Sequence, residues 1–125
     1  MKLPAWLRYA TVGAVATAAH YALLAWAVEV AHWPPALGAA AGAVLGAQLA
    51  FVGNRRFTFD HRGPWRAAWW RFQLTAVLGA LTSAAVVAGG TALGAHYLLA
   101  QVAATLLALG LTYAVNRRWT FGRPG

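Results

Sequence analysis

Four long apolar segments limit what this chain can fold into more than any other feature of its sequence. They cover approximately residues 9–28, 36–52, 72–93 and 97–115. A helix needs about 20 predominantly apolar residues to cross a hydrocarbon core of about 30 Å, and each segment is close to that length. Only 10% of the residues are charged, whereas an average soluble domain has roughly 25%. The sequence therefore predicts an all-α integral membrane bundle of four transmembrane helices, forming a single membrane domain over residues 1–125.

Residues between the apolar segments support this division. Pro34-Pro35 separates the first two segments, because proline is tolerated at a helix start but disfavours helix at the residue before it. Residues 94–96 make a tight connection between the last two. Residues 65–71 alternate Trp and Arg, which predicts a short interfacial helix or a helical lead-in to the third segment. The first segment exceeds the apolar region of a secretory signal, which has about 7 to 15 residues, so we expect no cleavage.

A short motif occurs twice, after the second and after the fourth apolar segment. The first motif, residues 54–59, reads Asn-Arg-Arg-Phe-Thr-Phe, and the second motif, residues 116–121, reads Asn-Arg-Arg-Trp-Thr-Phe. Self-similarity at a fixed spacing indicates a duplicated structural unit. We therefore expect two parallel two-helix repeats, at about residues 1–62 and 63–125.

The positive charges predict the orientation in the membrane. Ten Lys and Arg against two acidic residues give a net charge of +8, and all ten lie before the first segment, between the second and third, or after the fourth. The positive-inside rule then predicts cytoplasmic termini and a cytoplasmic central loop in the plasma (inner) membrane. In a soluble chain such a charge would suggest nucleic acid, but the apolar segments overrule that interpretation.

Paired arginines at a membrane edge are suited to bind phosphate. A guanidinium group can bind two phosphate oxygens at once, and a neighbouring asparagine can add a neutral hydrogen bond. An arginine followed by an aromatic residue also opens each half of the chain. The predicted lipid-phosphate-binding residues are Asn54, Arg55, Arg56, Asn116, Arg117, Arg118, Arg8 and Arg71. The alternative is that these arginines only fix orientation and bind anionic lipids weakly, at about 1 kcal/mol each.

Four other polar residues are candidates for contact with a head group or for coupling. His20 lies near the middle of the first segment and Glu29 lies at its end, whereas Gln101 and Thr105 lie on one stripe of the fourth. Ionisable groups in a membrane span are costly and suggest function. The alternatives are a solvated helix end for Glu29 and ordinary hydrogen bonding within the bundle for the others.

Small residues in the second segment predict close helix packing. Gly38, Gly42 and Gly46 recur at every fourth position, which is the small-xxx-small pattern of membrane helix contacts. This glycine ridge could serve contacts within one chain or between copies, and we expect a homo-oligomer. The chain has no cysteine and shows no metal-ligand spacing, catalytic triad or phosphate-binding loop. We therefore expect no metal, no cofactor and no enzymatic activity.

Taken together, these features resemble the GtrA-like family of small bacterial membrane proteins. The resemblance rests on four short spans, on both motifs and on the pairs Arg8-Tyr9 and Arg71-Phe72. It implies a role in cell-surface polysaccharide synthesis, in which a polyprenyl-phosphate-linked sugar is moved to the outer leaflet. Alternatively, it implies an anchor or scaffold for the membrane glycosyltransferase that makes this lipid. A small proton-coupled multidrug exporter is a third hypothesis, but both carboxylates lie at span ends.

Overall fold

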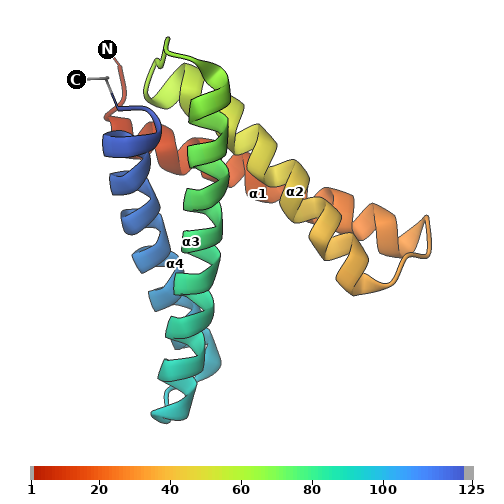
Figure 1. Ribbon diagram of the computed structural model, residues 1–125. Coiled ribbons are helices and arrows are strands. Elements are labelled where there is room, and N and C mark those ends of the chain that lie inside the picture. The colour runs from red at the N-terminus through yellow and green to blue at the C-terminus, as the bar shows by residue number, and fades with distance from the viewer. Residues whose placement is uncertain (1, 123–125) are drawn as a thin grey trace. The chain divides into compact units, whose positions relative to one another are not determined.

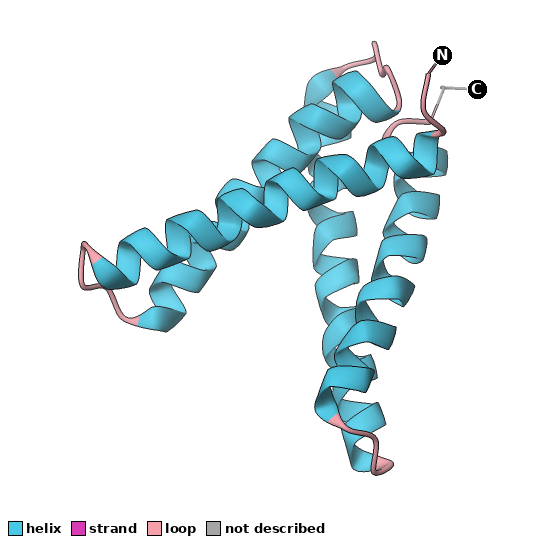
Figure 2. Ribbon diagram, turned by 180° about the vertical axis from the view of Figure 1, so that it is seen from behind, coloured by secondary structure: helices cyan, strands magenta, loops and turns pink. Residues whose placement is uncertain are grey.

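The computed structural model describes residues 2–122, and its regular elements within that range are helices (Figures 1 and 2). Four helical stretches are long and apolar enough to cross a membrane. The prediction of an all-α, multi-pass membrane protein is confirmed. In chain order, the elements are α1 (Ala5–Glu29), α2 (Pro35–Gly53), η1 (Asn54–Thr58), α3 (Trp65–Ala92), α4 (Tyr97–Val115) and η2 (Asn116–Thr120), where η marks a π-helix.

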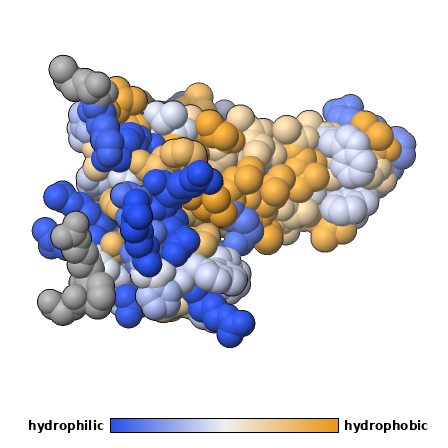
Figure 3. Space-filling view, turned by 90° about the horizontal axis from the view of Figure 1, so that it is seen from above, coloured by the Kyte–Doolittle hydropathy of each residue, from blue (hydrophilic) through white to orange (hydrophobic). Residues whose placement is uncertain are grey.

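The chain divides into two compact units, with the boundary between His61 and Arg62. The first unit is a hairpin of α1 and α2, and the second is a hairpin of α3 and α4 (Figure 1). On the face seen in Figure 3, apolar residues lie along the α1–α2 hairpin and hydrophilic residues appear at its far tip. The boundary is one residue from the expected junction of the repeats. That both repeats form one membrane domain stays a prediction.

The ends of α2 and α4 follow the sequence signals closely, whereas α1 begins at Ala5 and α3 at Trp65, before the expected residues 9 and 72. α4 has the predicted bounds, and α2 begins at Pro35, the second residue of the proline pair. The Trp- and Arg-rich residues 65–71 form the first turns of α3, so they are a lead-in to the third span and not a separate helix. Gly94 has φ of +93°, a conformation that glycine adopts without steric cost, and it lies in the tight connection to α4.

The glycine ridge packs α2 against α1 inside the first unit. A Cβ atom added to Gly42 would lie 2.5 Å from Cδ2 and 2.6 Å from the carbonyl oxygen of His20. One added to Gly46 would lie 3.1 Å from the carbonyl oxygen of Ala16. The two backbones can approach this closely only because these positions lack side chains. Because α1 covers the ridge, self-association would use another face, and the homo-oligomer stays a prediction.

The second unit obtains the same close approach with alanines. Ala100 and Ala104 lie at the positions that correspond to Gly38 and Gly42, and they are 4% and 0% exposed. On the facing helix, a Cβ added to Gly90 would lie 3.0 Å from the Cβ of Ala100. Small residues on one or both helices therefore define the interface in each hairpin.

Candidate lipid-phosphate site

Each motif continues the helix before it as one π-helical turn. The Phe59 N–H donates to the Asn54 carbonyl at 2.9 Å, and the Phe121 N–H donates to the Asn116 carbonyl at 2.8 Å. These bonds join residues five apart, which is the π-helical spacing, and single π-helical turns are frequent at functional sites. The apolar spans thus end in a locally widened helix at both copies of the motif. Sequence analysis did not predict this widening.

The asparagine and threonine of each motif point into the protein. Asn54 and Thr58 are each 2% exposed, and Asn116 and Thr120 are each 1% exposed. The Thr58 hydroxyl donates to the Asn54 side-chain oxygen at 2.7 Å. In the second unit the hydroxyls of Thr75 and Thr120 lie 3.3 Å apart. Residues four apart share one face of a helix, so the spacing of Asn and Thr could have identified this inward pair from the sequence.

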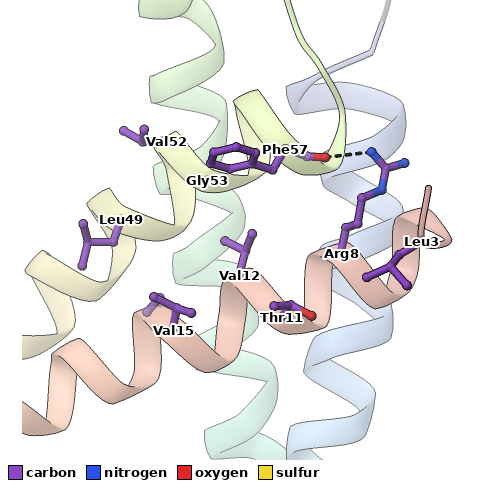
Figure 4. Close-up of a pocket in the computed structure, with 10 residues that line it drawn as sticks. Leu3, Arg8, Thr11, Val12, Val15, Leu49, Val52, Gly53 and Phe57 are labelled. Atoms are coloured by element: carbon purple, nitrogen blue, oxygen red, sulfur yellow. Dashed lines mark hydrogen bonds between the residues drawn. The ribbon is translucent and has the colours of Figure 1, made fainter. Parts of the chain in front are cut away.

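The arginine near the start of each half of the chain donates a hydrogen bond to a backbone carbonyl in the π-turn of the same unit. Arg8 Nη1 donates to the Phe57 carbonyl at 2.7 Å (Figure 4). Arg71 Nη1 donates to the Trp119 carbonyl at 3.0 Å. The last carbonyl groups of a helix receive no hydrogen bond from an N–H of that helix. A cation there also interacts favourably with the helix dipole. Arg8 and Arg71 therefore cap their motifs from the facing helix, a contact that sequence analysis did not predict.

The aromatic neighbours of these residues pack together as well. The rings of Tyr9 and Phe59 have centroids 6.2 Å apart, and those of Phe72 and Phe121 are 6.0 Å apart. Both distances are within the range of favourable aromatic pairs. The arginine-aromatic opening and the threonine-phenylalanine end of each motif therefore form one contact cluster in each unit.

The paired arginines lie on the outer side of the motifs. Arg56, Arg117 and Arg118 are exposed, and Arg55 is half-buried. The Arg56 guanidinium carbon lies 5.7 Å from the ring centroid of Phe57, which is itself 61% exposed. A phosphate that approaches the surface would meet these guanidinium groups first, because the asparagine side chains lie inside. Direct phosphate binding by any of these residues stays a prediction.

The structure does not bring the other candidates to the motifs. His20 is half-buried against the glycine ridge, and Glu29 is the exposed last residue of α1. The Gln101 side chain donates to the Thr105 hydroxyl at 3.2 Å, and that hydroxyl donates to the Gln101 carbonyl at 2.9 Å. Both are thus bonded within their own helix, about 22 Å (Gln101) and about 17 Å (Thr105) along the axis from Asn116. Within residues 2–122, no three His, Cys, Asp or Glu side chains converge as metal ligands would.

An apolar groove of about 500 Å³ runs along the first unit beside the first motif (Figure 4). Arg8 and Thr11 are its polar residues, and its walls come from both α1 and α2. Val15 and Leu49 face each other at the end away from Arg8. The lining residues are Leu3, Arg8, Thr11, Val12, Val15, Ala16, Leu49, Val52, Gly53 and Phe57.

Comparison with known families identifies the family of this domain. Residues 8–121 match the model of the family described as GtrA/DPMS, transmembrane domain. The matched range begins at the first capping arginine and includes both motifs. No curated protein gives a significant sequence match. The family match supports a role in membrane-associated synthesis of polysaccharides or glycolipids.

Proposed function

We propose that this chain, which belongs to the GtrA/DPMS transmembrane-domain family, moves a polyprenyl-phosphate-linked sugar across the plasma (inner) membrane, alone or as a subunit. The transfer would serve cell-surface polysaccharide or glycolipid synthesis. The observation that carries this proposal is the local structure of the two motifs. Each holds an arginine pair at the end of a membrane span, on a π-turn fixed from within by buried Asn and Thr side chains.

The chemistry of the arginine pairs suits a lipid phosphate. A guanidinium group presents a planar set of donors that matches two phosphate oxygens, and it stays charged at any physiological pH. Because the inward residues and the capping arginine fix the backbone of the motif, less conformational freedom is lost when the paired arginines bind. Preorganisation of this kind increases affinity without new contacts.

The positions of the motifs suggest a direction for the process. With both motifs on the cytoplasmic side, as the positive-inside rule predicts, the phosphate is captured from the cytoplasmic leaflet. The isoprenoid chain stays in the lipid while the head group crosses. His20, Glu29, Gln101 and Thr105 remain candidate contacts for the head group. The process involves transfer across the membrane and no covalent step.

The second candidate is a membrane anchor for a polyprenyl-phosphate glycosyltransferase. The exposure of Arg56, Arg117 and Arg118 favours it, because exposed cations can dock an acidic surface of a partner. In that case, motif substitutions weaken association and leave leaflet transfer unchanged. Proton-coupled drug export has less support, because Glu29 and Asp60 are both exposed and lie at or beyond helix ends.

Binding of polyprenyl phosphate to the purified protein in nanodiscs tests the proposal. We expect saturable binding that falls at least tenfold in Arg55→Ala/Arg56→Ala and in Arg117→Ala/Arg118→Ala. The control is Arg66→Ala, which removes an exposed cation outside the motifs. A phospholipid of equal charge, measured at two salt concentrations, reports the nonspecific part. Equal affinity for the two lipids, unchanged in the motif variants, would reduce the arginine pairs to determinants of orientation or of partner docking.

A further inference from the structure

We propose that the apolar groove of the first unit holds the isoprenoid chain of the lipid, starting from a phosphate placed at Arg8. This inference rests on the proposed function and assigns a location to the ligand. The groove joins the two kinds of surface that such a lipid requires. Its walls are apolar along most of their length, and a permanently charged guanidinium lies toward one end.

Arg8 retains donors for the phosphate after it has capped the motif. Its hydrogen bond to the Phe57 carbonyl uses Nη1. A guanidinium has five N–H donors, and Nη2 makes no hydrogen bond among the described residues. The Phe57 contact also fixes the direction of the side chain. The phosphate would therefore meet a cation whose direction is fixed by its contact with the first motif.

The size of the groove fits a single hydrocarbon chain. From Arg8 to Ala16 it extends about 12 Å along α1, at a rise of about 1.5 Å per residue. The groove offers about 500 Å³. The half-buried cation of Arg8 toward one end favours a hydrocarbon chain with an anionic head group over the apolar face of a partner helix or of a second copy.

The floor of the groove is closely packed. Gly53 lets α2 approach α1 here, because a Cβ there would lie 2.7 Å from Cγ1 of Val12. An unfilled apolar groove on a membrane span forfeits dispersion contacts, which a chain lying in it restores. The exposed Val15 and Val52, at 62% and 58%, are available to such a chain.

A photoreactive polyprenyl phosphate, with the diazirine on the isoprenoid chain, tests the assignment in nanodiscs. We expect crosslinked peptides to concentrate in residues 11–16 and 49–53. Val15→Trp should fill the groove and lower crosslinking there at least fivefold, without disturbing a side chain that faces outward. The matched control is Leu78→Trp at the corresponding position of the second unit, which is 41% exposed. This control should crosslink like the wild type.

The outcomes separate this inference from the proposed function. Saturable binding with crosslinks spread evenly over the outer faces of the helices would overturn the groove and leave the proposed function standing. Unchanged crosslinking in Val15→Trp would do the same. Equal displacement of the probe by diacyl phosphatidic acid would overturn the isoprenoid assignment. Absence of saturable binding in the wild type would contradict both. Inorganic phosphate, added alone, should not displace the probe.

Discussion

At the duplicated motif, the role of each side chain follows from its position on the π-turn. The first and fifth residues point inward and are buried, whereas the arginines between them lie half-buried or exposed. Sequence analysis grouped Asn54 with the arginines as phosphate ligands and did not predict that Thr58 bonds to it. Both side chains are only 2% exposed, and the Thr58 hydroxyl donates to the Asn54 side-chain oxygen. The two residues therefore bond to each other inside the protein. Asparagine thus supports the site from within, and arginine forms its surface.

Loss of the inward hydrogen bond should destabilise the first unit. Thr58→Val keeps the volume but removes the donor to Asn54, which leaves a buried oxygen without that bond, at a cost of about 1–3 kcal/mol. Thr105→Val is the control, because that hydroxyl is exposed and bonds within its own helix. Thermal unfolding in detergent, followed by circular dichroism, should show a lower transition for Thr58→Val. Equal transitions in the two variants would contradict a structural role of the threonine.

The capping arginines and the paired arginines should respond differently to substitution. Arg8→Ala removes a donor to the Phe57 carbonyl. Because this hydrogen bond is partly exposed, we expect the free energy of unfolding of the first unit to fall by about 1 kcal/mol. Arg56→Ala should leave stability within about 0.5 kcal/mol, as surface substitutions usually do, while lowering lipid affinity. Unfolding and lipid binding measured on the same preparations separate the two effects. A larger stability loss for Arg56→Ala than for Arg8→Ala would reverse the assignment.

At the scale of helices, the two hairpins show why some packing could be predicted and some could not. The apolar segments predicted four long helices, and the proline pair predicted the start of α2 to within one residue, because length and proline chemistry act locally. The glycine ridge predicted close packing, but its partner could not be named. Whether α1 or another copy covers Gly42 depends on the three-dimensional fit with His20, which the pattern of one helix does not contain. The π-turns likewise depend on long-range contacts such as that of Arg8.

A single methyl group on the ridge should disturb the first hairpin. Gly42→Ala would place a Cβ within 2.6 Å of the His20 carbonyl oxygen, which forces α1 and α2 apart. Overpacking of this kind typically costs about 1–3 kcal/mol. Gly89→Ala is the control, because nothing lies within 4 Å of its added Cβ. Monodisperse yield and thermal unfolding should decline for Gly42→Ala alone. Equal behaviour of the two variants would contradict the packing described here.

At the scale of the whole molecule, the proposed function requires a defined orientation in the membrane. The positive-inside rule predicts that both motifs lie on the cytoplasmic side. The chain contains no cysteine, so single introduced cysteines can be labelled cleanly. A membrane-impermeant maleimide should label Val30→Cys and Ala95→Cys in intact cells, and Arg62→Cys only after permeabilisation. Labelling of Arg62→Cys in intact cells would invert the topology and remove cytoplasmic capture of the lipid.

Leaflet transfer by the purified protein tests the central claim most directly. Proteoliposomes would contain a fluorescent polyprenyl-phosphate sugar, and a membrane-impermeant quencher would report the fraction in the outer leaflet. We predict that wild-type protein increases the transfer rate several-fold over empty vesicles and that Arg117→Ala/Arg118→Ala abolishes the increase, with Arg66→Ala behaving like the wild type. A protein that binds the lipid saturably but leaves transfer at the rate of empty vesicles would contradict autonomous translocation and favour the anchor.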